Sequence, residues 1–248
     1  MKKLYRTIVP LSIRKALWDL RNLWSHAFSD QLPAQWEFDY ETYWEQRLKE
    51  RGDNISYPEF VQITSNIITG GVRILDIGCG AGTFLLELGD LKRISGVGVD
   101  ISQKAIEIAR MNGVEAYVSD ASKDDLSELG EFEIITCFEV LEHIPNSEVL
   151  LRNILSWFPD ADVIVSIPNT GYIASRFRLL MGRFPKQWHI HPSEHLRYWT
   201  LRDFRVMVEG MGYKVLQILP VRGFPTLARW RPSLFSTALV FHLRANAY

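Results

Sequence analysis

Cysteine and long apolar runs are both scarce in this sequence. The two cysteines, Cys79 and Cys137, are too few for a disulfide framework and are typical of reduced thiols in a cytosolic protein. No apolar run approaches the roughly 18 residues that span a bilayer. The basic N-terminus lacks the continuous apolar stretch of a secretory signal, because Pro10, Ser12 and Arg14 interrupt it. We therefore expect a cytoplasmic protein.

An overall excess of one charge sign is also missing. The 28 Lys and Arg nearly balance the 29 Asp and Glu, and a net charge of −1 argues against a nucleic-acid-binding protein. A length of 248 residues with 47% hydrophobic side chains suits one α/β domain with added segments, or two small domains. Basic side chains are nevertheless concentrated at the start, where residues 1–29 hold six Lys and Arg against Asp19 alone.

Residues 12–27 have the apolar spacing of an amphipathic helix. Leu17, Leu20 and Trp24 share one face, whereas Arg21 lies largely off it. A basic amphipathic helix lies on an anionic membrane surface, or it packs on the rest of the protein or on a partner subunit. Both alternatives stay open at the level of sequence, and the oligomeric state is not predicted.

The most informative stretch begins with an apolar run, Val72–Leu75, that predicts a buried strand. Asp76 follows, then three glycines spaced by two, then a helical pattern from Phe84 onward. Glycines adopt positive φ and let a ligand approach the backbone, and the start of the helix presents unpaired N–H groups. Strand, glycine loop and helix in this order predict a cofactor cradle; the alternative is a glycine-rich turn without a ligand.

This D-x-G-x-G-x-G pattern resembles motif I of the class I S-adenosylmethionine-dependent methyltransferases. The resemblance implies S-adenosylmethionine as cofactor, bound by Asp76, Gly78, Cys79, Gly80 and Gly82. An NAD-dependent Rossmann enzyme is disfavoured, because the glycines do not complete the G-x-G-x-x-G/A frame.

Strands and helices alternate over residues 72–167, which predicts an α/β fold with a doubly wound parallel sheet. The family resemblance supplies the finer order of seven strands, 3-2-1-4-5-7-6, with strand 7 antiparallel. The remaining expected elements are helices at 57–68, 103–111, 148–158 and 201–209, strands at 94–99, 114–118, 132–138, 163–167, 213–219 and 238–243, and a loop at 221–236. Thr200 is the expected N-cap of the last of these helices.

Acids follow the second and third expected strands. Asp100 comes 24 residues after Asp76, the spacing at which a carboxylate binds the ribose hydroxyls, with Ile101 beside it. Its alternative role is to cap the next helix, which suits Ser102 better. Asp120 follows the third strand, where the family places an acid on the adenine amine, and Ala121 adjoins it; the alternative is an exposed turn aspartate.

A second motif follows the fourth strand. The string Phe138-Glu-Val-Leu-Glu-His-Ile-Pro resembles the corresponding motif of ubiquinone-type small-molecule methyltransferases, which places Phe138 at the cofactor. Glu139 and His143 are four residues apart, so they face the same way if they form one helical turn. We expect His143 to be a general base oriented by Glu139; the alternative is a histidine that only bonds the backbone.

Aromatic and basic segments flank these motifs. Residues 38–47 are rich in aromatics and resemble a cap over the cofactor, with Tyr43 as a candidate contact; the alternative is a core anchor. The aperiodic, basic and aromatic segment 170–200 suggests a lid and an anionic or glycosidic acceptor. We therefore expect a basic amphipathic extension at 1–37 and a methyltransferase domain at 38–248, with cap and lid segments at 38–69 and 170–200.

His189, His191 and His195 form an H-x-H-x₃-H pattern with three imidazoles as candidate metal ligands. Their spacing requires a bent backbone and no cysteine is adjacent, so no metal is predicted. The order from Ser166-Ile-Pro-Asn to His195-Leu-Arg-Tyr-Trp also resembles the MetW family, which is linked to methionine biosynthesis.

Two functions follow. The first is methyl transfer from S-adenosylmethionine to a small polar acceptor, with O-methylation favoured and a saccharide or cell-envelope precursor as candidate. The second is a MetW-like, cofactor-binding partner or activator of an acyltransferase. The basic segment 12–27 leaves open a peripheral contact with the inner face of the membrane.

Overall fold

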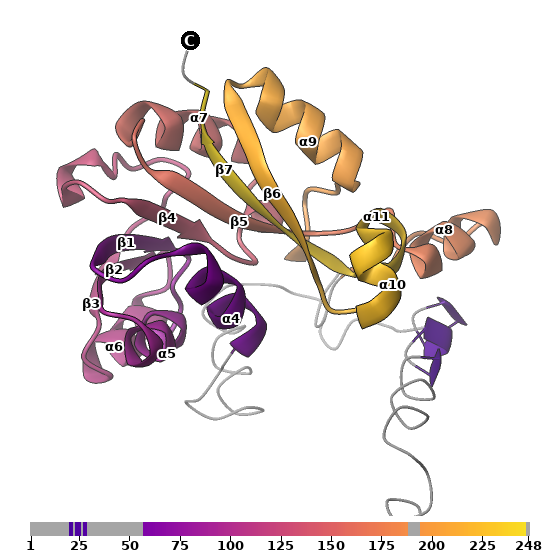
Figure 1. Cartoon of the computed structure of the whole chain (residues 1–248), viewed down its shortest axis with the longest axis horizontal. Helices are drawn as coiled ribbons and strands as arrows, with labels where there is room; N and C mark the ends of the chain where they lie inside the picture. Colours follow the sequence, from indigo (N-terminus) through magenta and orange to yellow (C-terminus); the bar gives the residue numbers. More distant parts are fainter. Residues whose placement is uncertain (1–19, 22, 26, 29–56, 188–193, 247–248) are drawn as a thin grey trace, which may run out of the picture.

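The computed structural model describes residues 20, 21, 23–25, 27, 28, 57–187 and 194–246. They form a seven-stranded sheet in the order β3-β2-β1-β4-β5-β7-β6, which confirms the expected topology (Figure 1). The strands are β1 Val72–Ile77, β2 Ile94–Asp100, β3 Glu115–Val118, β4 Ile134–Cys137, β5 Asp162–Pro168, β6 Tyr213–Val221 and β7 Ala238–Ala245.

Strand direction divides the sheet into two parts. Neighbours among β1 to β5 pair in parallel, so their carboxyl ends meet at one edge. β7 runs antiparallel both to β5 and to β6, between which it lies. The parallel half therefore supplies an edge where ligands of doubly wound sheets bind.

Helices cover both faces of the sheet, and alternate strand residues face opposite layers. Leu75 belongs to a core with α7 and α9, whereas its neighbour Ile74 belongs to a second core with α4, α5 and α6. The helices are α4 Pro58–Ile67, α5 Thr83–Leu91, α6 Gln103–Met111, α7 Ser147–Trp157 and α9 Leu201–Gly210.

Two helix starts confirm the capping residues expected from the sequence. Ser102 Oγ accepts a hydrogen bond from Ala105 N at the start of α6, at 3.3 Å. Thr200 Oγ1 accepts one from Asp203 N at the start of α9, also at 3.3 Å. Each bond satisfies one N–H that the first helical turn leaves unpaired, and so fixes where the helix begins.

Two segments are more regular than expected. The aperiodic stretch after β5 contains the helix α8 Ile173–Leu180, and the expected loop after β6 contains α10 Pro225–Trp230 and α11 Pro232–Phe235. α10 and α11 each begin with a proline, whose fixed φ suits the first turn. Both have six residues or fewer, too short for a periodic apolar pattern to reveal them.

Part of the N-terminal segment is described. Residues 20, 21, 23–25, 27 and 28 are helical, whereas residues 12–19 of the expected amphipathic helix lie outside the described residues. Tyr43 and the aromatic segment 38–47, like His189 and His191, also lie outside them. Within the described part of the chain, no helix is long and apolar enough to cross a membrane.

Candidate active site

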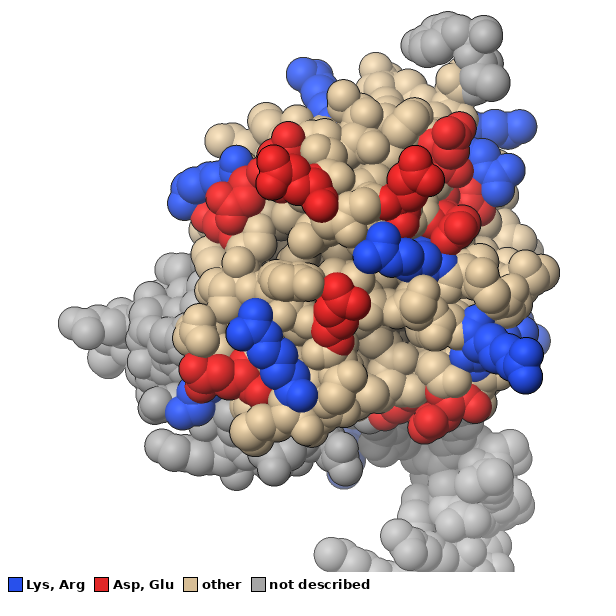
Figure 2. All heavy atoms as spheres, turned by 90° about the vertical axis from the view of Figure 1, so that its left-hand side faces the viewer, with Lys and Arg blue, Asp and Glu red and all other residues tan. Residues whose placement is uncertain are grey.

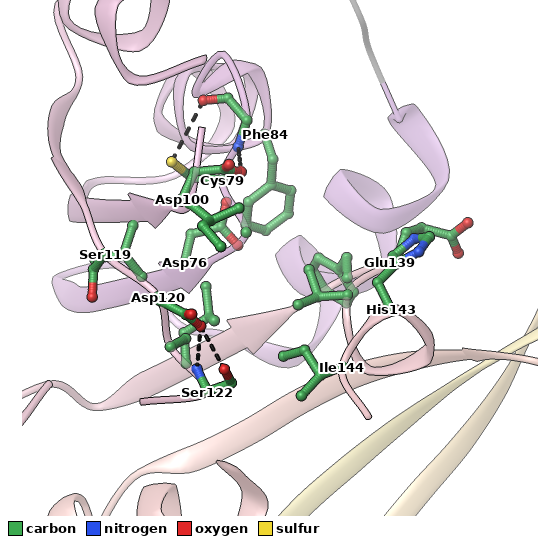
Figure 3. A pocket seen from close by; sticks show the side chains of 18 of the residues that line it. Asp76, Cys79, Phe84, Asp100, Ser119, Asp120, Ser122, Glu139, His143 and Ile144 are labelled. Atoms are coloured by element: carbon green, nitrogen blue, oxygen red, sulfur yellow. Dashed lines mark hydrogen bonds between the residues drawn. The ribbon is translucent and has the colours of Figure 1, made fainter. Parts of the chain in front are cut away.

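One pocket lies at the carboxyl edge of the parallel strands. It has a volume of about 560 Å³, which is within the range of small-molecule sites. In Figure 3, Asp76, Asp100 and Asp120 lie at one end of it and Glu139 and His143 at the other. The predicted residues that line it are Asp76, Gly78, Cys79, Gly80, Asp100, Ile101, Asp120, Ala121, Phe138, Glu139 and His143.

The glycine loop follows β1 and has left-handed backbone. Gly78, Gly80 and Gly82 have φ of 76°, 55° and 77°, values that side chains other than glycine disfavour. A Cβ on Gly78 would lie 2.1 Å from Val140 Cγ2, because the loop after β4 packs directly against it. Gly78 therefore lets two walls of the pocket meet.

Gly82 has a different place. It precedes α5 as its N-cap residue and does not line the pocket. A Cβ there would lie 2.7 Å from Val114 Cγ2 and 3.3 Å from Ala109 Cβ. Close packing of α5 against the α6–β3 connection accounts for this glycine, and its contact with a cofactor stays a prediction.

Asp100 is held in place by the backbone around it. Its two carboxylate oxygens accept hydrogen bonds from Gly80 N at 3.0 Å and Ser102 N at 2.9 Å. The side chain is 9% exposed, and that exposure is toward the pocket it lines. Each carboxylate oxygen has two lone pairs and can accept more than one hydrogen bond, so these bonds hold the group in place without defining its whole acceptor capacity.

Asp120 lines the same end of the pocket at the turn after β3. Its oxygens accept hydrogen bonds from Ser122 Oγ at 2.5 Å and from Lys123 Nζ at 2.6 Å. Partial burial raises the pKa of Asp120, but these bonds outweigh it and hold the pKa below its ordinary value. The carboxylate is thus ionised and able to accept a further hydrogen bond.

Asp76 is buried at the end of β1 and is 4% exposed. Burial raises its pKa to about 7, despite a 2.7 Å hydrogen bond that Thr136 Oγ1 donates to it, and nearby Asp100 raises it further. A carboxylate whose charge is this poorly compensated favours a cationic ligand. Burial likewise raises the pKa of the neighbouring Cys79 thiol, which keeps it protonated.

Glu139 to His143 do not form the single helical turn that would place both side chains on one face. Glu139 has φ of 55°, and the chain then forms a short 3₁₀ turn, η2, over Leu141–His143. A left-handed residue at the start changes the directions in which the following side chains point, so a spacing of four does not place Glu139 and His143 on one helical face. Both nevertheless line the pocket.

Glu139 is fixed by groups that the sequence did not indicate. Its backbone N–H donates to Ser166 Oγ at 2.7 Å, and one carboxylate oxygen lies 3.7 Å from Arg222 Nη1. Arg222 also binds Glu59 of α4 at 2.7 Å. Because Arg222 follows β6, it joins three elements that are far apart in the sequence.

His143 faces the segment that follows the undescribed residues 188–193. Its Nδ1 hydrogen-bonds the carbonyl oxygen of Glu194. A carbonyl only accepts, so Nδ1 carries the hydrogen and Nε2 is the basic nitrogen. The ring of His195 lies edge-on to that of His143, with 4.9 Å between the centroids.

Glu142 precedes His143 in the chain but does not itself line the pocket. Its side chain is fully buried, and neither carboxylate oxygen has a hydrogen-bond partner within the described residues. Burial, with nearby Glu139, raises its pKa well above the ordinary value. One ligand atom each of Glu142, His143 and His195 lies within 4.8 Å of the others, a donor set that suits a divalent cation. This candidate ligand set therefore differs from the set suggested by the sequence pattern, His189, His191 and His195.

Aromatic rings form the wall between the two ends of the pocket. Phe138 stacks on Phe60 of α4, with 4.6 Å between ring centroids and an interplanar angle of 1°. Phe84 meets Phe138 edge-on at 5.2 Å. No described residue of segment 170–187 lines the pocket. The lid role of that segment stays a prediction.

Comparison with known proteins identifies the family and supports the fold. A family model described as a methyltransferase domain matches residues 37–218. The chain is a member of this methyltransferase family. This match confirms the prediction of a methyltransferase. It also confirms S-adenosylmethionine as the cofactor, because that molecule is the family's methyl donor.

Similar proteins of known sequence or structure are also methyltransferases. The ubiquinone biosynthesis O-methyltransferase of Azoarcus sp. is 32% identical over 58% of this chain and 69% of its own length. The enzyme of the same name from Hahella chejuensis is 35% identical over 59% of this chain and 68% of its own length. A solved TehB-like SAM-dependent methyltransferase from Corynebacterium glutamicum shares the fold, with a TM-score of 0.55, 21% identity, and coverage of 83% of this chain and 97% of that one.

Proposed function

We propose that this methyltransferase transfers the methyl group of S-adenosylmethionine to a hydroxyl of a small acceptor bound beside His143. The observation that carries the proposal is the division of the pocket into two ends. One end has acidic side chains suited to a cationic nucleoside, and the other has a histidine whose basic nitrogen is Nε2. The names of the curated relatives, both O-methyltransferases, support an oxygen acceptor.

The donor end fits the cofactor by charge and by shape. S-adenosylmethionine carries a sulfonium and an ammonium group, and it supplies the electrophilic methyl when bound. Asp76 would bind these cationic groups, Asp100 the ribose hydroxyls and Asp120 the adenine amine. Asp100 is preorganised by two backbone N–H groups, so it loses little freedom when a ligand binds.

At the acceptor end, His143 would remove the hydroxyl proton as the methyl bond forms. The Glu194 carbonyl fixes the tautomer and the orientation of the ring. The proton moves from the acceptor oxygen to Nε2, and general-base catalysis of this kind contributes about 10²–10⁴-fold. Phe60 and Phe138 keep water from the space between donor and acceptor.

The same corner fits a divalent cation. Glu142 offers two buried oxygens without hydrogen-bond partners among the described residues, and His143 and His195 offer ring nitrogens. A cation there would lower the pKa of a bound acceptor hydroxyl. His143 would then be a ligand rather than the base, and the two roles are separable by experiment.

The acceptor class is open between two candidates. The basic segment 176–186 supported an anionic or glycosidic acceptor, but none of its residues lines the pocket. The aromatic wall and the relatives' names support an acceptor whose hydroxyl sits on an apolar or phenolic body. We therefore rank a phenolic acceptor above a cell-envelope saccharide.

The test is transfer of labelled methyl from S-adenosylmethionine to phenolic and saccharide panels. Activity on a phenolic hydroxyl, with kcat reduced about 10²–10⁴-fold in His143→Gln and cofactor affinity unchanged, supports the proposal. If transfer survives in His143→Gln, the assignment of the base is wrong. Loss of activity after chelation, restored by Mg²⁺ or Mn²⁺, favours the cation at this corner.

The MetW-like alternative remains distinguishable. An activator needs cofactor binding but no base. If the protein co-purifies with an acyltransferase and stimulates it equally as wild type and as His143→Gln, methyl transfer is not its function.

A further inference from the structure

Helix α8 projects from the body of the molecule beyond α10 and α11 (Figure 1). Three apolar side chains at its end and in the following turn are largely exposed: Leu180 is 84% exposed, Met181 60% and Phe184 63%. Scattered apolar residues are normal on a surface, whereas a contiguous group marks an interaction site.

The described N-terminal residues extend this group. Phe28 lies 5.4 Å from Phe177 of α8, centroid to centroid, and 4.3 Å from Trp24. Arg178 Nη1 and Arg183 Nη1 donate to the carbonyls of residues 27 and 28, both at 3.3 Å, which holds the two segments together. We call the exposed side chains of Trp24, Phe28, Phe177, Leu180, Met181 and Phe184 the α8 surface.

The two segments that contribute side chains to the α8 surface are basic and contain no acidic residue. Residues 20–28 and 171–187 contain no Asp or Glu, whereas Arg21 and Arg176 are exposed beside the apolar side chains. The side of the molecule opposite α8 carries acidic and basic side chains interspersed (Figure 2). The basic character of the α8 surface therefore contrasts with the mixed charge of that opposite side.

We propose that the α8 surface docks this protein on an anionic lipid bilayer. Aromatic and aliphatic side chains enter the boundary between head groups and acyl chains, and Lys and Arg attract anionic lipids. A second copy of this chain fits less well, because a two-fold contact would bring two positive surfaces together. The proposal does not depend on the acceptor or on the residues of the active site.

The test is flotation with phosphatidylcholine vesicles, with and without phosphatidylglycerol. We expect at least tenfold stronger binding to the anionic vesicles at 50 mM salt and a clear weakening at 500 mM, because salt screens exposed charges. Leu180→Glu/Met181→Glu should lose at least tenfold in binding. Arg21→Gln should lose about fivefold, the equivalent of about 1 kcal/mol per basic residue near the surface.

The matched control is Leu91→Glu/Met111→Glu. Leu91 and Met111 are 58% and 80% exposed on α5 and α6, away from the α8 surface. The control should bind vesicles like the wild type, and all variants should keep the wild-type melting temperature and cofactor affinity. Equal binding to both kinds of vesicle, binding to neither, or an α8 variant that turns a wild-type dimer into a monomer would overturn the proposal.

Discussion

Glu139 and Arg222 are the two described non-glycine residues with positive φ, 55° and 56°, and their side chains form an ion pair with 3.7 Å between Oε2 and Nη1. Left-handed backbone at such residues costs roughly 1–3 kcal/mol each and persists only where the surroundings hold it. Here each residue is part of what holds the other. The pair lies where β4 and β6 end, and Glu139 lines the pocket.

This relationship predicts a coupling between the two residues in turnover. Arg222→Met leaves Glu139 without its cationic partner, so we expect kcat to fall about tenfold while cofactor affinity stays unchanged. In a double-mutant cycle with Glu139→Gln, the coupling should reach about 1 kcal/mol. Arg222→Lys keeps the charge and should restore part of the rate. Additive effects on kcat would contradict a positioning role.

Asp76 predicts a pH-dependent stability of the ligand-free protein. Its folded pKa of about 7 lies above the unfolded value, so its contribution is full below about pH 4 and is lost as the pH rises through 7. The loss amounts to about 4 kcal/mol, from about 1.4 kcal/mol per pKa unit. Urea unfolding of wild type and Asp76→Asn from about pH 4 to pH 8 measures it. Equal pH slopes in the two proteins would contradict the shift.

Cofactor binding should remove the proton that burial keeps on the Asp76 carboxyl. A cationic ligand favours ionised Asp76, so binding at pH 6 should release a proton and affinity should rise toward pH 7. Calorimetry in two buffers of different ionisation enthalpy counts the protons. Asp76→Asn should bind more weakly and release fewer protons; unchanged proton release would assign it to another group.

Three glycines should respond differently to alanine. The Cβ of Gly78→Ala would displace Val140, so the affinity for the cofactor and kcat should fall together. Gly82→Ala strikes Val114 and Ala109 and should reduce stability by roughly 1–3 kcal/mol with little direct effect on the pocket. Gly113→Ala is the control, since it has positive φ but no atom within 4 Å. Equal losses in all three would mean that backbone strain alone matters.

The binding of the divalent cation that we propose beside His143 can be measured directly. Mn²⁺ titrated into the wild type should give a saturable calorimetric or paramagnetic signal, lost in Glu142→Gln and in His195→Gln. Glu107→Gln, on the surface of α6, is the control and should bind as the wild type does. Absence of Mn²⁺ binding in the wild type would leave Glu142 as a buried, protonated carboxyl and His143 as the base.

The sequence predicted the elements whose signals are local. The apolar runs of β1 and β5, the caps of α6 and α9, and the glycine loop all depend on neighbours within a few residues, and the structure confirms them. The strand order came from the family resemblance, because pairing between β5 and β7 joins residues that lie 70 to 80 positions apart in the sequence.

What the sequence did not predict depends on contacts across the fold or on unusual backbone. The φ of Glu139 has no signal in residue type, since glutamate seldom adopts it. Arg222 contacts Glu139 and His195 contacts His143, although both lie more than fifty positions further along the chain. His143 of the post-strand-4 motif does line the pocket, although residues 139–143 do not form one helical turn.

The position of β7 between β5 and β6 sets an order for biosynthesis. β6 pairs with β7 alone among the described strands, yet β6 leaves the ribosome first. Until residues 238–245 emerge, β5 and β6 each keep an open edge of unpaired N–H and C=O groups, and such edges recruit other chains. The nascent protein therefore needs β7 to cover these two edges as well as to bring Phe241 and Leu243 into the core.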